Sequence, residues 1–463
     1  MELLKHIKKN KSICIILAVF FVFKFIFLAG YTIVWWDSSV YIGMGKYIYS
    51  YGSSGIWEGS RPIIWPLMLG FLWKTGMDPA FHGRILEFVF GGACILLTYL
   101  IGKKIFDRKT ALLASLFLAL SPTFFFFNGI MLTETVSTAF SLLAIYFLTE
   151  KRNFMSGLFF GIAFLSRFLQ LFVFVAAALT AFVLYRNYFG NFKKMSLGFV
   201  AAVIPYLIIN QAIYLNPIHP FIAQFFLAMN SGWDNYHHLD FYFIELFKEN
   251  FLYLLSFSGI FLAFLSKSSH KKMIASIFMA LFVFFNSISQ KEMRFLIILM
   301  PYMYLLVSFS VFNFYNKLRS DGARMLPALI IVLPLIISVA AIPQYYEAES
   351  NKKNEYSAFQ SELDSASGAI WISSPVIAAF SDSRISKLMY YPFFNSENKN
   401  EMAAQIKDAD FVFLDSCDLA CRPSDSECEN SRKDMIFNLK KQMQTTYSSK
   451  NRECEQYIFR AIS

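Results

Sequence analysis

Long apolar runs separated by short polar loops constrain the fold of this chain more than any other feature. A helix of about 20 apolar residues crosses the hydrocarbon core of a bilayer. Eleven such runs occur, near residues 12–34, 85–101, 110–127, 131–149, 154–166, 168–185, 195–215, 251–266, 272–288, 295–315 and 325–343. Only 16% of the residues are charged, against about 25% in typical soluble proteins. The sequence therefore predicts a mostly α fold, a polytopic membrane bundle of about eleven transmembrane helices.

The loops between these runs alternate in charge. One kind is poor in charge and rich in Trp, Tyr, Asn, His and Pro, and the other is basic. The basic loops hold Lys5, Lys8, Lys9 and Lys11; Lys103, Lys104, Arg108 and Lys109; Lys151 and Arg152; Arg186, Lys193 and Lys194; Lys267, Lys271 and Lys272; and Lys317, Arg319 and Arg324. Because cytoplasmic loops carry such an excess of Lys and Arg, we expect the N-terminus inside and the C-terminus outside. These clusters also explain the net charge of +10, so no nucleic-acid partner is expected.

The first apolar run, Ser12–Val34, follows a basic N-terminus. It is longer than the core of a signal peptide and has no small-residue cleavage site. We therefore expect it to be retained as the first transmembrane helix.

Two outer turns are predicted to bring charged residues into the membrane. Both flanks of Phe154–Tyr185 are basic, so this segment must cross twice and turn near Arg167. The first pass reaches only about 20 Å at ~1.5 Å per residue, less than the ~30 Å core. Arg167 is then expected below the outer membrane surface, where an arginine is a candidate functional residue. The same reasoning places Asn128–Glu134 at a shallow outer turn, with Glu134 inside the bundle.

The chain changes character after Ile342. Residues 345–463 are polar, with charges of both signs, and predict a soluble extracytoplasmic domain after a transmembrane domain of residues 1–344. Strands are predicted at Ala369–Ser373, Phe411–Asp415 and Gln456–Ala461, and a helix at Asp434–Gln444. This pattern indicates a small α/β domain.

Four of the six cysteines lie in this last region, namely Cys417, Cys421, Cys428 and Cys454. An oxidising compartment favours disulfides, for which three pairings are possible. A metal site is the less favoured alternative, because the spacing has no paired CxxC units. Cys14 and Cys94 lie in apolar runs and are interpreted as packing residues.

Two acids at the predicted outer face are candidate catalytic residues. Asp37 follows Trp35 and Trp36 at the end of the first apolar run, where a carboxylate can take a proton from a substrate hydroxyl. A solvated aspartate that fixes the helix end is the alternative. Glu134 stands at the start of an apolar run, where a charge is costly unless it is paired. An arginine partner within the bundle could make its role structural.

Four outer cations run against the charge asymmetry of the other loops: Arg61, Arg167, Lys291 and Arg294. Binding of an anion explains them, because Arg and Lys suit phosphate. Pairing with Glu134 or Glu292 is the structural alternative. The sequence Asp408-Ala409-Asp410 has the DxD form of soluble sugar-nucleotide transferases, but we interpret it as the end of a helix before a strand. The sequence has no Gly-rich phosphate loop and no HExxH motif, so ATPase and zinc-protease activities have no support.

These outer residues together resemble the GT-C superfamily of polytopic glycosyltransferases, which includes protein O-mannosyltransferases, GPI mannosyltransferases and the lipid A aminoarabinose transferase. The resemblance covers essentially the whole membrane part. The motifs that carry it are Asp37 with Tyr41, Arg61-Pro62-x-x-x-Pro66, Leu132-Thr133-Glu134, Phe164-Leu165-Ser166-Arg167, Asn216-Pro217-x-x-Pro220 and Lys291-Glu292-x-Arg294-Phe295.

The resemblance implies transfer of a hexose, mannose or a similar sugar, from a polyprenyl- or dolichyl-phosphate carrier to a hydroxyl of a glycan, protein or lipid, with inversion. It implies Asp37 as the base and Glu134 as the second acid. Arg61, Arg167, Lys291 and Arg294 would bind the donor phosphate. Tyr41, Asn216 and His219 would contact the substrate. Some members have two adjacent acids in the first outer loop, whereas Ser38 follows Asp37 here. No cofactor is therefore expected, and a divalent metal is possible but not indicated.

A secondary transporter or lipid flippase is the alternative, because intramembrane Arg and Glu also occur there. It predicts an internal repeat, and the sequence shows none. A non-catalytic assembly subunit would tolerate alanine at Asp37, Glu134 and Arg294. The short loops favour a prokaryotic cell membrane, an archaeal one included, over the ER membrane.

Overall fold

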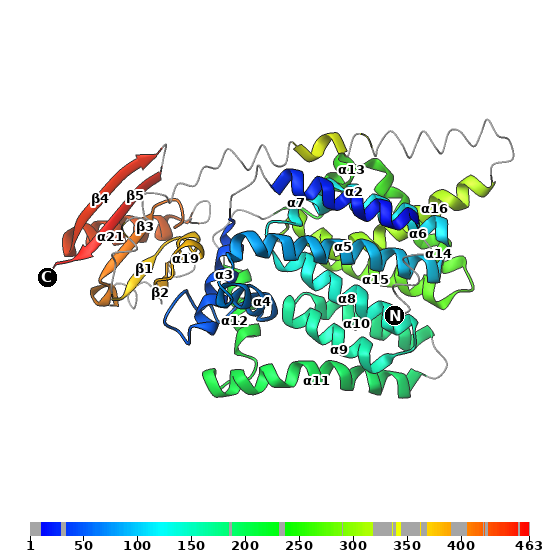
Figure 1. Cartoon of the computed structure of the whole chain (residues 1–463), viewed down its shortest axis with the longest axis horizontal. Coiled ribbons are helices and arrows are strands. Elements are labelled where there is room, and N and C mark those ends of the chain that lie inside the picture. The colour runs from blue at the N-terminus through cyan, green and yellow to red at the C-terminus, as the bar shows by residue number, and fades with distance from the viewer. Residues whose placement is uncertain are drawn as a thin grey trace. The chain divides into compact units, whose positions relative to one another are not determined.

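The computed structural model describes a largely helical chain with a small sheet near its C-terminus (Figure 1). The described residues are 11–28, 34–184, 188–230, 237–288, 290–317, 336, 339–343, 362, 368–389, 405–419, 421, 425–451 and 454–462. They fall into two compact units. The first comprises Met1–Thr32, Arg84–Ile213 and Tyr236–Asn351, and the second Ile33–Gly83, Tyr214–Asn235 and Lys352–Ser463. The predicted domain boundary at residues 344 and 345 lies outside the described residues.

The first unit is a helical bundle. Its helices are α2 (Lys11–Leu28), α5 (Pro79–Ile105), α6 (Arg108–Leu120), α7 (Pro122–Phe127), α8 (Thr133–Thr149), α9 (Asn153–Ser166), α10 (Gln170–Leu184), α11 (Tyr188–Tyr214), α13 (Phe241–Glu249), η1 (Phe251–Leu254), α14 (Leu255–Leu265), α15 (Ser269–Ser287), η2 (Met293–Ile298) and α16 (Met300–Lys317). The predicted run 110–127 is divided between α6 and α7, because Ser121 caps α7 and Pro122 occupies its first turn.

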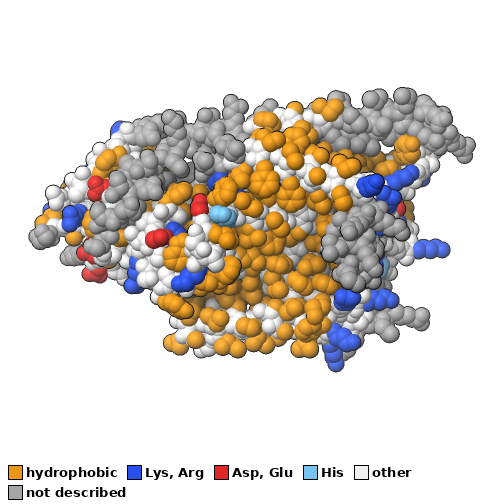
Figure 2. All heavy atoms as spheres, in the orientation of Figure 1, with side chains coloured by type: hydrophobic (Ala, Val, Ile, Leu, Met, Phe, Trp, Pro, Cys, Tyr) orange, Lys and Arg blue, Asp and Glu red, His pale blue; other side chains and the backbone are white. Residues whose placement is uncertain are grey.

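Three described helices are long and apolar enough to cross a membrane, namely Lys11–Leu28, Pro79–Ile105 and Gly190–Tyr214. Shorter apolar helices are Asn153–Ser166, Gln170–Val183 and Phe251–Leu265. Figure 2 shows a broad hydrophobic surface over this bundle. The exposed apolar residues of the bundle include Leu179 and Val183 of α10 and Leu197 and Ile208 of α11. The mostly α character is confirmed, while the number of eleven spans stays a prediction. The predicted span 325–343 lies outside the described residues, apart from 336 and 339–343.

The basic loops converge on one end of the bundle. Lys104, at the end of α5, forms an ion pair with Glu150, at the end of α8. Asn153 donates a hydrogen bond of 2.8 Å to Asn191 of α11, and Lys271 of α15 lies 5.5 Å from the ring centre of Phe106. Alternate loops of a polytopic bundle lie at the same end, so the alternation of loop charges predicts that the basic loops lie together. The orientation in a membrane stays a prediction.

The two predicted turns are present at the opposite ends of α8 and α9. Arg167 follows α9 with extended backbone, and α10 begins at Gln170. The segment 128–132 joins α7 to α8, and Glu134 in the first turn of α8 is only 1% exposed. Both turns lie away from the end where Lys104 meets Glu150.

The second unit combines the first polar segment with the C-terminal sheet. It contains α3 (Trp36–Tyr49), α4 (Ile64–Lys74) and α12 (His219–Asn230). Helices α3 and α4 approach backbone to backbone, because a Cβ on Gly45 would lie 2.6 Å from the backbone nitrogen of Gly70. The buried Lys46 of α3 donates to the carbonyls of Ala379 and Ser381 and pairs with Asp382 at 3.0 Å. The helix of Asp37 is thus fixed to the C-terminal part of the chain.

The sheet is mixed, in the order β2-β1-β3-β5-β4. Its elements are β1 (Ile370–Ile372), α19 (Val376–Phe380), β2 (Ile385–Leu388), η3 (Ile406–Asp408), β3 (Phe411–Asp415), α21 (Ser426–Gln442), β4 (Met443–Asn451) and β5 (Cys454–Ala461). Strands β2, β1 and β3 are parallel, and β5 is antiparallel to β3 and β4. Alternate residues of β3 enter two apolar clusters, Val412 and Leu414 with α21 and Phe411 and Phe413 with Ile56. The predicted α/β character of the C-terminal region is confirmed, while its extent as a separate domain stays a prediction.

Two details of this domain differ from prediction. Helix α21 begins at Ser426 rather than Asp434, because Asp425 caps it by accepting from the Cys428 amide. Strands β2 and β4 were not predicted. Asp410 accepts a 2.6 Å hydrogen bond from the backbone of Ala369, which gives the DxD sequence a structural role.

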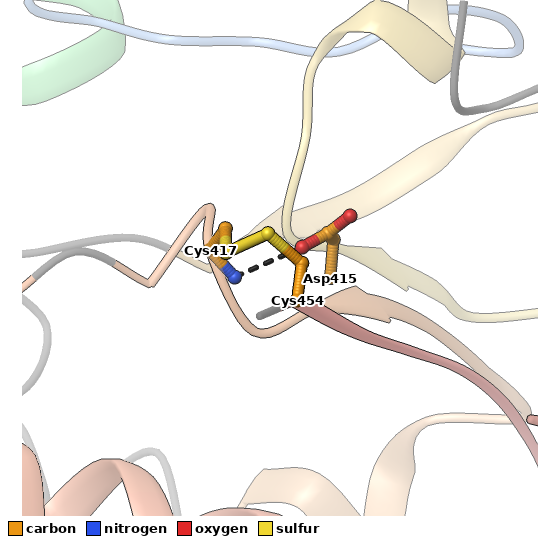
Figure 3. A group of neighbouring side chains, drawn as sticks. All are labelled: Asp415, Cys417 and Cys454. Carbon is orange, nitrogen blue, oxygen red and sulfur yellow. Dashed lines mark hydrogen bonds between the residues drawn. A yellow bond between two sulfur atoms is a disulfide. The ribbon is translucent and has the colours of Figure 1, made fainter. Parts of the chain in front are cut away.

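Both disulfides are formed. They join Cys417 to Cys454 and Cys421 to Cys428, one of the three possible pairings. Figure 3 shows Asp415 beside the first, where its carboxylate accepts from the Cys417 amide at 2.9 Å. Asp415, Cys417 and Cys454 are close enough to share an ion, but both sulfurs belong to the disulfide and are not thiolate ligands.

Removing the two disulfides is expected to have unequal effects. The sequence separations are 37 and 7 residues. Because a disulfide that closes a longer loop removes more entropy from the unfolded chain, the expected contribution to the free energy of unfolding is about 4 kcal/mol for Cys417–Cys454 and about 2 kcal/mol for Cys421–Cys428. The paired serine variants of the full chain are compared by thermal unfolding, and the first pair should unfold at the lower temperature. Non-reducing peptide mapping that finds Cys417 joined to Cys421 or Cys428 would contradict the pairing.

Candidate active site

The first charged cluster lies in the helical bundle, around Glu134. Its carboxylate pairs with Arg167 Nη1 at 3.1 Å and lies 3.5 Å from Arg294 Nε. Arg167 also donates to Thr133 Oγ1 at 3.0 Å. Three of the predicted site residues, from three separate segments, therefore meet at the start of α8. The pairing that we considered as the structural alternative is present.

Arg294 has a second carboxylate partner. Its Nε and Nη2 lie 2.6 and 3.0 Å from the two oxygens of Glu292, a two-pronged contact. The Phe295 ring lies 5.1 Å from the Arg167 guanidinium and 5.7 Å from that of Arg294. Tyr242 holds the segment by donating to the Glu292 carbonyl and accepting from its amide. Two guanidinium groups are thus fixed side by side at one aromatic ring, a geometry that suits a phosphate.

Lys291 has a different environment. It is 2% exposed, and its ammonium donates to the carbonyls of His237 at 2.9 Å and Ile288 at 2.6 Å. These contacts fix the loop between α15 and η2. A direct contact of Lys291 with a donor phosphate stays a prediction.

The second charged cluster lies in the second unit, around Asp37. Asp37 is in the first turn of α3, where the helix dipole favours a negative charge. Arg61 Nη1 pairs with Asp37 Oδ1 at 2.9 Å, and Arg61 Nε pairs with Glu58 at 3.0 Å. Asp37 is 6% exposed. The ion pair with Arg61 holds the Asp37 carboxylate in place, an arrangement that suits a general base.

Of the three predicted substrate residues, one lies within helix α3 and two lie in the segment around the start of α12. Tyr41 is buried within α3, at 3% exposure. Asn216 Oδ1 accepts from the Ile218 amide at 3.1 Å, just before α12. His219 stacks on Tyr214 at 4.3 Å, and Tyr214 accepts a 2.7 Å hydrogen bond from Trp57. The 214–219 segment therefore lies beside the segment 57–61 that carries Arg61.

Sequence reasoning missed two buried charges, Lys24 of α2 and Glu87 of α5, both 0% exposed. Glu87 Oε2 accepts from the amides of Gly129 and Met131. Lys24 donates to the carbonyls of Phe125 and Asn128. The signal was available, because each is a single charge within an apolar run.

Comparison with known proteins places this geometry in a family context. The family model for dolichyl-phosphate-mannose-protein mannosyltransferases matches residues 60–210, which include Arg61, Glu134 and Arg167. The solved structure of ArnT from Cupriavidus metallidurans bound to undecaprenyl phosphate has a TM-score of 0.70 and 9% identity, over 97% of this chain and 98% of that one. The chain has the GT-C fold. The predicted resemblance to this superfamily of membrane glycosyltransferases is thereby confirmed.

Two further GT-C structures agree. The archaeal oligosaccharyltransferase AglB from Archaeoglobus fulgidus, in complex with an inhibitory peptide and a dolichol-phosphate, has a TM-score of 0.59 and 12% identity, over 97% of this chain and 74% of that one. The mycobacterial arabinofuranosyltransferase AftD has a TM-score of 0.53 and 9% identity, over 96% of this chain and 40% of that one. No curated protein matches the sequence significantly. At these identities the likeness establishes the fold, and the substrate has to be argued from the residues.

Proposed function

We propose that this GT-C protein transfers a hexose, mannose or a similar sugar, from a polyprenyl- or dolichyl-phosphate carrier to a hydroxyl acceptor outside the cytoplasm. The observation that carries the proposal is the convergence of Arg167 and Arg294 on the buried Glu134. The two arginines contact the Glu134 carboxylate, and they could contact the phosphate of a bound donor in its place. A departing lipid phosphate is the anion that a transferase of this fold has to stabilise.

Asp37 is the proposed base. Its carboxylate takes the proton of the acceptor hydroxyl as the acceptor oxygen attacks the anomeric carbon. The bond from that carbon to the phosphate oxygen breaks in the same step, so the sugar inverts and the lipid phosphate leaves with both bonding electrons. Arg61 orients Asp37 from 2.9 Å. Arg167, Arg294 and Lys291 balance the charge that develops on the phosphate, a role that requires no metal.

The acceptor is a hydroxyl of a glycan, a protein or a lipid. Asn216 and His219, with the remainder of the 214–250 loop and the C-terminal domain, are proposed to select it. The stack of His219 on Tyr214 and the Trp57–Tyr214 hydrogen bond support this, because they join the loop to the segment of Arg61. Convergence of the basic loops at one end of the bundle supports an active site at the other end. We place the protein in a prokaryotic cell membrane, an archaeal one included.

The test is transfer in proteoliposomes. The protein is supplied with radiolabelled mannose or glucose on a polyprenyl phosphate, and the release of sugar from the lipid is followed. Donor-dependent release, with polyprenyl phosphate as the lipid product, is expected. Folded protein that releases no sugar from any lipid phosphate, but moves the lipid or a solute across the bilayer, would favour the transporter alternative.

A further inference from the structure

Two intramembrane charges have no role in the mechanism above, namely Lys24 and Glu87. They lie in α2 and α5, two of the three helices among the described residues that are long and apolar enough to cross a membrane. Both side chains are fully buried. A charge inside an apolar bundle is costly and is retained where its contacts do something that an apolar residue cannot.

Both charges contact the same short segment, 125–131, which leads into α8. Lys24 donates to two of its carbonyls, those of Phe125 and Asn128. Glu87 accepts from two of its amides, Gly129 at 2.8 Å and Met131 at 2.6 Å. The Asn128 side chain adds a 2.6 Å hydrogen bond to the Glu87 carbonyl. The cation therefore holds acceptors of this segment and the anion holds its donors.

The segment needs such support, because its backbone is strained. Met131 has φ +64°, in the left-handed region that favours glycine, and Gly129 has φ +132°. A left-handed conformation is unfavourable for a non-glycine residue and persists where surrounding contacts impose it. Here the contacts of Glu87 fall on the amides of these two residues.

Glu134 follows Met131 by three residues, in the first turn of α8. We propose that Lys24 and Glu87 are positioning residues, an intramembrane clamp that fixes the 128–132 turn and thereby places Glu134 against Arg167 and Arg294. The inference rests on the proposed function for its catalytic consequence. A displacement of about 1 Å at a reacting site can cost about 100-fold in rate, so a clamp on a strained turn matters for turnover.

The test uses the double variant Lys24→Met/Glu87→Met, which removes both charges together and leaves neither alone in the bundle. It also removes the carboxylate oxygen that accepts from the Gly129 and Met131 amides. In proteoliposomes kcat should fall about 100-fold while KM for the lipid donor changes by less than about threefold. In a Glu134→Gln background the same double change should cost less than about threefold, because the residue that the clamp places is already lost. Equal losses in both backgrounds would overturn the link to Glu134.

A second measurement does not depend on turnover. Hydrogen exchange of peptides that cover residues 126–137 should become faster in the double variant, because the amides of Gly129 and Met131 lose their acceptor. The matched control is Lys271→Met, which removes a lysine packed on the Phe106 and Phe309 rings and should change neither kcat nor this exchange. Unchanged exchange at 126–137 overturns the clamp whatever the activity. A wild-type protein without turnover, but with the expected exchange, refutes the proposed function and not the clamp.

Discussion

Asp37→Asn is expected to lower sugar transfer by about 10²–10⁴-fold, the contribution of a general base. The amide keeps the size of the side chain and can still accept from Arg61, which lies 2.9 Å away, but it cannot take the proton of the acceptor hydroxyl. The loss should appear in kcat, with little change in KM for the lipid donor, because the arginine site around Glu134 is untouched. The measurement is the initial rate of radiolabelled sugar transfer in proteoliposomes.

A matched control is available in the same polar segment. Asp78 caps the start of α5 by accepting from the Ala80 amide at 2.9 Å, and asparagine caps a helix about as well as aspartate. Asp78→Asn makes the same chemical change and should retain wild-type transfer. If Asp37→Asn turns over at the rate of Asp78→Asn, Asp37 is a helix-end residue and the base lies elsewhere.

The turn at Arg167 and the pairing of Glu134 could be predicted because they follow from segment length and charge. A pass too short for the bilayer located the break at Arg167, and a glutamate at an apolar helix start indicated a buried partner for Glu134. Pairing of the outer cations with Glu134 or Glu292 was considered, but which cation pairs with which acid could not be predicted. Nothing in the sequence distinguishes the partners of Arg61, Arg167 and Arg294. Only the fold shows that Arg61 pairs with Asp37 and the other two with Glu134.

The C-terminal domain shows a different limit of prediction from the sequence. Strands β1, β3 and β5 were predicted from their apolar residues, whereas β4 is almost entirely polar and forms the outer edge of the sheet next to β5. Its strand conformation comes from antiparallel pairing with the next strand, β5, which the polar residues of β4 do not indicate by themselves. The disulfide pairing is of the same kind, since spacing left three alternatives and the sheet brings Cys454 of β5 beside the end of β3.

Arg294 should be the most sensitive of the cations. It is the one arginine that contacts both Glu134 and Glu292 among the described site residues, so its guanidinium is held in place before any substrate binds. Because a fixed donor to a developing anion contributes about 10²–10³-fold, Arg294→Met should lower kcat by that factor. Arg294→Lys keeps the charge but loses the planar, two-pronged contact, and we expect it to fall between the wild type and Arg294→Met.

The experiment measures kcat and KM for the three proteins, with Arg152→Met as the control because Arg152 is an exposed cation at the other end of α9. A further comparison separates phosphate stabilisation from packing. If Arg294 acts on the leaving phosphate, Arg294→Met should weaken inhibition by the product polyprenyl phosphate. If Arg294 only neutralises Glu134, Arg294→Met should leave that inhibition unchanged, and adding Glu134→Gln should restore transfer. Recovery of transfer in Arg294→Met/Glu134→Gln would therefore show that Arg294 has a structural role and takes no part in the reaction.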